Sequence, residues 1–285
     1  MIPAAFDYES PKTLNEALSL LASREDAKLL AGGHSLLPAM KLRLASPALL
    51  IDLGRIAGLD YIRDSGETIN IGALTTHATV ASSSLLLSAS PLLAQAASNI
   101  GDIQVRNRGT IGGSLAQAHP SADYPASILA LDAHIVAFSQ SGERVIPARA
   151  FFTGMFTTAL RPDEIITEIR VPKTTGAGAV YKKFHHPASG YAVVGVAVVV
   201  RGNSAKIEDV SIGITGVGEI AYRAAAVEDA LRGKPASAIA QAAKHAADKV
   251  EALGDNYASA EYRRHLAEVY TRRALQEALS SKRGK

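Results

Sequence analysis

At 285 residues with 47% hydrophobic side chains, the chain can form about two domains of roughly 150 residues each, with ample material for a core. Its net charge of +3, from 30 Lys and Arg against 27 Asp and Glu, lacks the basic excess of nucleic-acid-binding proteins. The absence of cysteine excludes thiolate-ligated zinc or iron–sulfur sites, disulfides and a cysteine nucleophile. Any redox chemistry on this chain therefore needs a bound organic cofactor.

The N-terminal residues 1–9 carry acidic side chains where a signal peptide has basic ones followed by an apolar stretch. The longest apolar run, residues 192–200, is much shorter than the roughly 20 residues that span a bilayer. We therefore expect a cytoplasmic protein that neither is exported nor spans a membrane, and we interpret the apolar run as a buried strand.

The N-terminal part of the chain alternates between helical and extended patterns. Thr13 and Glu16 have the spacing of a capping box, which predicts that a helix begins there. Short apolar runs at 27–31 and 49–53 predict buried strands, with a helix over 35–44 between them. This β-α-β order predicts a parallel strand pair.

Between residues 68 and 171 the patterns predict mostly strands, with two helices among them. Apolar and alternating runs predict strands at 68–73, 134–138, 144–146 and 164–171, and helices at 91–100 and 125–131. Residues 139–142 form a predicted turn that joins two of these strands into a hairpin. Residues 101–122 are rich in Gly, Asn, Arg, Ser and Gln and lack periodicity, so we expect a long loop there, and such loops are usually functional.

The Pro- and Gly-containing stretch 172–178 resembles a linker and predicts two domains, residues 1–175 and 176–285. Beyond it the pattern predicts three strands, at 180–184, 191–200 and 205–215. An almost wholly helical segment at 221–278 and a solvated tail at 282–285 follow. The expected fold class is α+β. The first domain would combine a small β-α-β part with a larger mixed sheet, and the second three strands with helices.

Common catalytic motifs such as HExxH, GxSxG and the P-loop are absent. The adjacent His185 and His186 would point to opposite faces of a strand, so no shared metal is expected. Residues 216–221 fit the GxGxxG/A dinucleotide pattern, but neither the further strand nor the acidic residue of a Rossmann unit follows. We interpret them as a strand-to-helix turn.

Two other Gly-rich segments carry a stronger signal when they are taken together. Residues 31–35, Ala-Gly-Gly-His-Ser, lie between a predicted strand and a predicted helix, where backbone N–H groups can bind a pyrophosphate. Residues 108–114, Arg-Gly-Thr-Ile-Gly-Gly-Ser, combine paired glycines with two hydroxyl groups inside the predicted loop. Either segment alone is more typical of a simple turn.

With their neighbours, these segments resemble the FAD-binding medium subunit of the molybdenum hydroxylases, the xanthine dehydrogenase family, and most of all its aerobic carbon monoxide dehydrogenase members. The resemblance rests on residues 30–36, 41–43, 50–53, 100–114, 121–126, 181–183 and 190–192. It extends over nearly the whole chain. It implies a PCMH-type FAD-binding domain, the vanillyl-alcohol-oxidase type, followed by a carbon monoxide dehydrogenase flavoprotein C-terminal domain.

Carried over residue by residue, the resemblance implies FAD contacts at Ala31, Gly32, Gly33, His34, Ser35, Leu36, Ile100, Gly101, Thr110, Gly113, Ser114, Asp123, Lys183 and Tyr191. The glycine-rich segments would hold the diphosphate and ribityl groups, Asp123 would accept hydrogen bonds from sugar hydroxyls, and Lys183 and Tyr191 would lie near the isoalloxazine ring. The alternatives are a helix N-cap for Asp123 and plain strand positions for Lys183 and Tyr191. Ser114 departs from the Asn of many relatives, which leaves a hydroxyl in place of an amide.

The resemblance also implies an oxidoreductase complex, with this chain as its electron-transfer subunit. A large subunit with a molybdenum cofactor would oxidise the substrate, and [2Fe–2S] clusters of a small subunit would pass electrons to the FAD of this chain and on to quinone or NAD. The lack of cysteine agrees, because the clusters need thiolates from another chain. No catalytic residue or metal ligand is expected here, and the assembly would be a heterohexamer, a dimer of heterotrimers.

Two other functions stay open at this point. A self-standing flavin-dependent oxidoreductase acting directly on a small molecule would need acid–base groups over the flavin, for which His34 and Tyr191 are the candidates. A scaffold subunit that has lost FAD is disfavoured by the paired glycines and Asp123. The sequence does not identify the substrate or the final electron acceptor.

Overall fold

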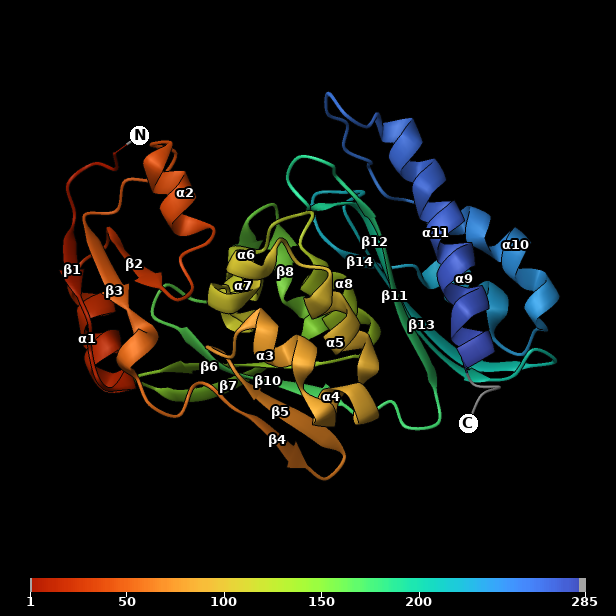
Figure 1. The fold of residues 1–285 in the computed structure, drawn as a ribbon, viewed down its shortest axis with the longest axis horizontal. Helices are drawn as coiled ribbons and strands as arrows, with labels where there is room; N and C mark the ends of the chain where they lie inside the picture. The colour runs from red at the N-terminus through yellow and green to blue at the C-terminus, as the bar shows by residue number, and fades with distance from the viewer. Residues whose placement is uncertain (1, 282–285) are drawn as a thin grey trace.

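The structure is a computed structural model that describes residues 2–281. The predicted tail at 282–285 lies outside the described residues. A small N-terminal unit, a central unit and a C-terminal sheet follow one another across the molecule (Figure 1). Within the described range, no helix has both the length and the apolar character needed to cross a membrane.

The N-terminal unit is a parallel three-stranded sheet in the order β1-β3-β2. Its elements are β1 (Asp7–Glu9), α1 (Leu14–Ser23), β2 (Ala27–Leu30), α2 (Leu36–Lys41) and β3 (Leu49–Asp52). The capping box is confirmed, because Thr13 accepts from the Glu16 N–H while Glu16 accepts from the Thr13 N–H. The parallel pair of β2 and β3 is confirmed as well. Strand β1 was not predicted, because its residues are all exposed and show no apolar alternation.

The central unit is an antiparallel sheet in the order β4-β5-β10-β6-β7, with helices packed on one face (Figure 1). Its strands are β4 (Ile62–Ser65), β5 (Thr68–Gly72), β6 (His134–Ser139), β7 (Gly142–Pro147) and β10 (Ile165–Pro172), and β8 (Phe152–Gly154) and β9 (Thr157–Thr158) form a separate hairpin. Its helices are α3 (His77–Ser82), α4 (Ser84–Ala89), α5 (Pro91–Ser98), α6 (Ile103–Arg108), α7 (Ile111–Gln117) and α8 (Asp123–Ala130). The predicted β6–β7 hairpin is confirmed.

The prediction of a long loop over residues 101–122 is wrong. The segment folds into the short helices α6 and α7, each of which begins at a side-chain cap. Asp102 accepts a hydrogen bond from the Val105 N–H, and Thr110 accepts one from the Gly113 N–H. Helices of 6 and 7 residues are too short to show an apolar period, and their glycines lower helix propensity, so the sequence pattern hid them.

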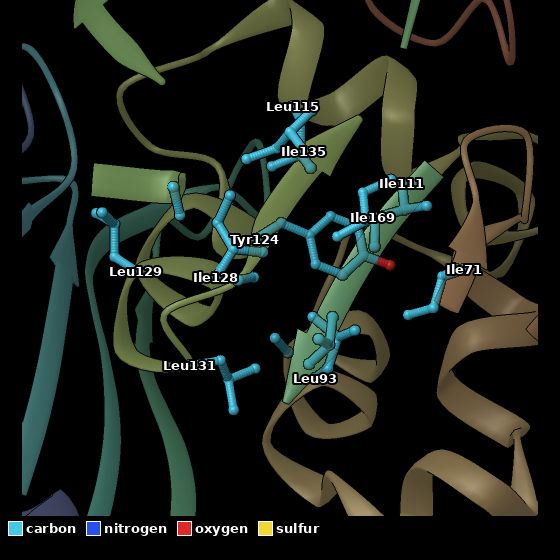
Figure 2. Close-up of a cluster of buried hydrophobic side chains, with 14 of the residues drawn as sticks. Ile71, Leu93, Ile111, Leu115, Tyr124, Ile128, Leu129, Leu131, Ile135 and Ile169 are labelled. Atoms are coloured by element: carbon cyan, nitrogen blue, oxygen red, sulfur yellow. The ribbon is translucent and has the colours of Figure 1, made fainter. Parts of the chain in front are cut away.

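Helix α8 lies at the centre of the molecule, and every one of its residues is buried. Tyr124 on this helix is fully buried among Leu93, Ile111 and Ile169 in the core of the central unit (Figure 2). The other side of α8 packs on the C-terminal sheet, as does α5. Helices α5 and α8 therefore form a layer between the two sheets, which fixes the C-terminal domain against the first.

The C-terminal domain is an antiparallel sheet in the order β11-β12-β13-β14, with helices on the face away from α8 (Figure 1). Its elements are β11 (Gly178–His185), β12 (Ala192–Gly202), β13 (Ile207–Thr215), β14 (Tyr222–Arg223), α9 (Ala225–Leu231), α10 (Ile239–Ala242) and α11 (Ala260–Ser280). Three strands and a wholly helical remainder were predicted. The structure adds the two-residue strand β14, and residues 249–258 are irregular. The turn at 216–221 therefore leads first into β14, although no Rossmann unit follows, as expected.

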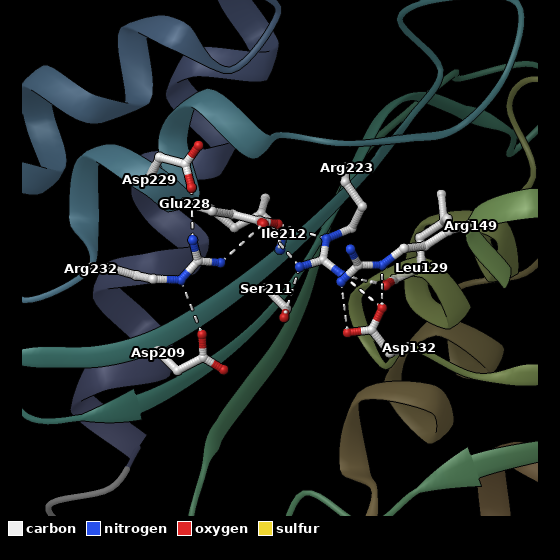
Figure 3. A network of polar contacts seen from close by, with 10 residues as sticks. All are labelled: Leu129, Asp132, Arg149, Asp209, Ser211, Ile212, Arg223, Glu228, Asp229 and Arg232. Carbon is white, nitrogen blue, oxygen red and sulfur yellow. Dashed lines mark hydrogen bonds and ion pairs between the residues drawn. The ribbon is translucent and has the colours of Figure 1, made fainter. Parts of the chain in front are cut away.

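Arg223 on β14 connects the two domains through buried polar contacts (Figure 3). Its guanidinium forms an ion pair with Glu228 at 2.6 Å and one with Asp132 at 3.0 Å, and it also donates to the Leu129 carbonyl at 3.1 Å. The neighbouring Arg232 bonds Asp209 and Asp229 at the exposed end of the same network, and also forms a longer ion pair with Glu228 at 3.7 Å. Leu129 and Asp132 belong to the first domain, so Arg223 holds β14 against the C-terminal end of α8.

Replacing Arg223 with Met should lower the free energy of unfolding by about 3 kcal/mol, because the buried Glu228 would lose its closest charged partner and keep only the longer ion pair with Arg232. The matched Arg232→Met variant, at an exposed position, should lose less than about 1 kcal/mol. Urea unfolding followed by circular dichroism measures both. Equal losses for the two variants would contradict the connecting role of Arg223.

Candidate cofactor site

The two Gly-rich segments, residues 31–35 and 108–114, meet in space although they lie far apart in the sequence. A Cβ atom on Gly32 would overlap the carbonyl oxygen of Arg108 and lie 2.7 Å from the Cα of Gly109. A Cβ on Gly113 would lie 3.5 Å from that of Ala31. The first segment can therefore approach the second only because residue 32 has no side chain.

The first segment carries free hydrogen-bond donors. No described residue accepts a hydrogen bond from the backbone N–H of Gly33, His34 or Ser35. Gly33 has φ +75°, and the His34 Nδ1 lies 2.9 Å from the Gly32 carbonyl. Residues 32–35 therefore form a tight turn before α2 begins at Leu36. Consecutive unpaired N–H groups of this kind suit an oxygen-rich anion such as a diphosphate.

The second segment differs from what its glycines suggest. Its N–H groups from Ile111 to Ser114 all donate within the protein, to Thr75, Ala73 and Thr110. Residues 111–114 therefore offer no unpaired backbone donor to a ligand. The buried Thr110 serves as the N-cap of α7, and Ser114 lies half-buried in its first turn.

Three further predicted residues, Ile100, Gly101 and Tyr191, lie near the first Gly-rich segment. The hydroxyl of Tyr191, just before β12, lies near the Ser35 side chain. A Cβ on the preceding Gly190 would lie 3.8 Å from the Cα of Gly101, which places the half-buried Ile100 and the exposed Gly101 beside the same loop. Burial raises the pKa of Tyr191, so its hydroxyl stays protonated at neutral pH.

Asp123 and Lys183 bond one another in the interior between the two domains. The Lys183 ammonium lies 2.9 Å from the Asp123 carboxylate and donates to the Asn99 carbonyl at 2.9 Å, and the Lys183 side chain is 1% exposed. The Tyr181 hydroxyl donates to the same carboxylate at 2.6 Å. Gly195 on the neighbouring strand β12 pairs with Lys183, and a Cβ atom on Gly195 would overlap the Tyr181 hydroxyl. The absence of a side chain at residue 195 therefore leaves room for this hydroxyl.

This arrangement changes the interpretation of both charged residues. The carboxylate of Asp123 is neither a simple helix cap nor a free acceptor, and Lys183 is not an isolated cation or a strand-surface residue. Burial and the negative charge of Asp123 hold the pKa of Tyr181 well above its usual range, so the phenol remains a donor. Direct contact of Asp123 or Lys183 with a cofactor stays a prediction.

Two histidines that the sequence did not single out also belong to the site. His119 stacks on Tyr191 with ring centroids 4.3 Å apart and accepts from the Ser121 N–H through Nδ1. The buried His77 lies with Nε2 against Gly109, and its Nδ1 is 3.2 Å from the Tyr124 hydroxyl. Both contacts join distant parts of the chain, so no local pattern could have revealed them.

The chemistry of this surface fits FAD. Unpaired N–H groups at residues 33–35 suit the diphosphate, and the stacked Tyr191 offers an aromatic face for a flat ring system. Bound FAD would supply the redox centre that this chain's own side chains cannot provide. Among the described residues, no cluster of His, Asp or Glu could hold a metal ion.

The chain matches two described families. Residues 4–174 match the FAD binding domain in molybdopterin dehydrogenase, and residues 179–278 match the CO dehydrogenase flavoprotein C-terminal domain. These matches define a flavoprotein with an added C-terminal domain. The chain belongs to the family of FAD-binding medium subunits of molybdenum hydroxylases, and the division at residue 175 stays a prediction.

Similar proteins include several dehydrogenase subunits. The carbon monoxide dehydrogenase medium chain of Hydrogenophaga pseudoflava is 43% identical over 98% of this chain and 98% of its own length. The nicotine 6-hydroxylase medium subunit of Paenarthrobacter nicotinovorans is 39% identical over 96% of this chain and 97% of its own. The chain thus spans these relatives almost completely.

Solved structures agree with these sequence relatives. The carbon monoxide dehydrogenase of Hydrogenophaga pseudoflava contains a chain that matches with a TM-score of 0.95 at 43% identity, covering 98% of this chain and 99% of that one. Quinoline 2-oxidoreductase of Pseudomonas putida 86 matches with a TM-score of 0.94 at 30% identity, covering 99% of both chains. The expected fold class and flavoprotein domains are therefore confirmed.

Gly32→Ala should reduce FAD affinity at least about tenfold, because relieving the overlap with Arg108 costs about 1–3 kcal/mol and separates the two segments. Gly154→Ala is the matched control, since the nearest atom to its Cβ would be at an ordinary 3.6 Å. Fluorescence titration with FAD measures both. An unchanged affinity for Gly32→Ala would show that the contact between the segments does not shape the site.

Burial, aided by electrostatic repulsion from His34 and Arg106, lowers the pKa of His77 from 6.5 to about 4. The stability that comes from the neutral ring is therefore present above about pH 6.5 and lost as the pH falls towards 4. Between about pH 7 and pH 5 the wild-type free energy of unfolding should fall about 2 kcal/mol further than that of His77→Gln. Urea unfolding at both pH values tests this, and the exposed control His134→Gln should keep the wild-type slope.

Proposed function

We propose that the chain binds FAD at the surface formed by residues 31–36, 100–101 and 191, and acts as the electron-transfer subunit of a molybdenum hydroxylase complex. The observation that carries this proposal is the meeting of three unpaired N–H groups with Tyr191, which comes from the other domain. Electrons would arrive from the [2Fe–2S] clusters of a small subunit and leave to an external acceptor, quinone or NAD. Ser114, Thr110 and Gly113 would line the side of α7.

The composition supports a role in which other subunits hold the remaining redox centres. Iron–sulfur clusters need cysteine thiolates, and this chain has none. The relatives are themselves named as medium chains or subunits, and this chain covers 98% and 97% of the length of two of them. The partners would be an iron–sulfur subunit and a large molybdenum subunit, assembled as a dimer of heterotrimers in the cytoplasm.

The substrate would be selected on the large subunit. The names of the relatives differ in substrate, from carbon monoxide to glyceraldehyde, nicotine and caffeine, at 43% to 35% identity over nearly the whole chain. A shared medium subunit with different substrates agrees with substrate oxidation elsewhere in the complex. This chain's identity to the carbon monoxide dehydrogenase medium chain favours a complex of that type.

The site favours electron transfer over direct catalysis on a small molecule. Its two acid–base candidates already contact other groups of the protein, because the His34 Nδ1 lies 2.9 Å from the Gly32 carbonyl and His119 stacks on the Tyr191 ring. A direct oxidoreductase needs such a group poised to move a proton to or from the substrate. This chain's residues would instead bind FAD, orient it and leave its redox edge accessible near the exposed Tyr191.

Purified chain, mixed with FAD and desalted, should retain stoichiometric flavin by visible absorption, and dithionite should reduce it. In the complex formed with the iron–sulfur and molybdenum subunits, substrate should reduce this flavin, and quinone or NAD should reoxidise it. Reduction of flavin in the isolated chain by a small organic substrate would instead favour a self-standing enzyme. A complex purified without flavin would contradict the proposal.

A further inference from the structure

The turn at residues 99–101 is held by two cationic side chains from different parts of the fold. Lys183 donates to the carbonyl of Asn99 at 2.9 Å. Arg106 on α6 donates through a single nitrogen, Nη1, to the carbonyls of Ile100 and Gly101, both at 2.9 Å. Three successive carbonyl oxygens therefore face cations, which is unusual for a turn whose residues are partly exposed.

The orientation of these carbonyls fixes the direction of the next two N–H groups. In a planar trans peptide the C=O and N–H bonds point in opposite directions, and the described residues contain no cis peptide. The N–H groups of Gly101 and Asp102 therefore point away from the Arg106 guanidinium. Neither donates to any described residue, and both residues are exposed.

These two donors lie beside the loop that carries Tyr191. Gly101 approaches Gly190, the residue before Tyr191, and the Tyr191 ring offers the flat aromatic face of the site. The free N–H groups of residues 33–35 already suit the diphosphate. The donors at 101 and 102 are thus left for a different oxygen, at the end of the cofactor nearest the aromatic face.

We propose that Arg106 is a positioning residue that, by binding the carbonyls of Ile100 and Gly101, presents the N–H groups of Gly101 and Asp102 to a carbonyl oxygen of the flavin's pyrimidine ring. This inference rests on the proposed FAD site. Hydrogen bonds to that oxygen stabilise the additional negative charge of the reduced ring, so the donors would raise the flavin midpoint potential. Arg106 itself would not touch the cofactor.

The test compares full-length wild type with Arg106→Met, Arg106→Lys and Arg55→Met. Arg55 is the matched control, because it is exposed outside the proposed cofactor surface and its side chain forms no hydrogen bond or ion pair with a described residue. For Arg106→Met, FAD affinity should fall about tenfold or more, as expected for lost charged hydrogen bonds, and the midpoint potential should become more negative. Arg106→Lys should recover part of both, because its ammonium can still reach one carbonyl, whereas Arg55→Met should match wild type.

Thermal unfolding shows which variants are folded, and only folded variants are compared. If Arg106→Met does not fold, Arg106→Lys decides the outcome. Wild-type values for both affinity and potential in the Arg106 variants would overturn the inference while leaving the proposed function intact. A loss of affinity with an unchanged potential would also overturn it, since the donors would then serve another part of FAD. Failure of wild type and Arg55→Met to bind FAD would contradict the proposed function itself.

Discussion

The ion pair between Asp123 and Lys183 holds together the two domains and the cofactor surface between them. Burying both charges is costly unless each is paired and its remaining hydrogen-bonding groups are satisfied. Tyr181 and the Asn99 carbonyl complete the set, at 2.6 Å and 2.9 Å. Because Lys183 also bonds the residue just before Ile100, the position of the second domain is transmitted directly to the turn that lies beside Tyr191.

The cofactor surface is consequently a property of both domains. The first domain contributes the unpaired N–H groups of residues 33–35, and the second contributes Tyr191, whose hydroxyl lies near Ser35. The layer formed by α5 and α8, together with the contacts of Arg223, fixes the position of the central sheet relative to the C-terminal sheet. The proposed electron-transfer role needs such fixed placement, because the flavin would have to remain at one distance from a partner's redox centre while an external acceptor could still reach it.

Much of the fold could be predicted from the sequence, whereas the cofactor contacts of the site stay a prediction. The Thr13–Glu16 capping box, the β6–β7 hairpin and the apolar β12 strand have local signatures, and each is confirmed. Helices α6 and α7 were missed because six or seven residues show no period. The pairing of Asp123 with Lys183 and the stacking of His119 on Tyr191 join residues far apart in the chain, so only the folded arrangement reveals them.

A double-mutant cycle on FAD affinity tests the central claim, that Asp123 and Lys183 act as one unit joining the domains at the cofactor surface. Affinity is measured for wild type, Asp123→Asn, Lys183→Met and the combined variant by fluorescence titration. If the pair acts as a unit, each single change should weaken binding about tenfold or more, and the double change should be little worse than either. Losses that add would contradict the account, because they would show that the two side chains contact FAD independently.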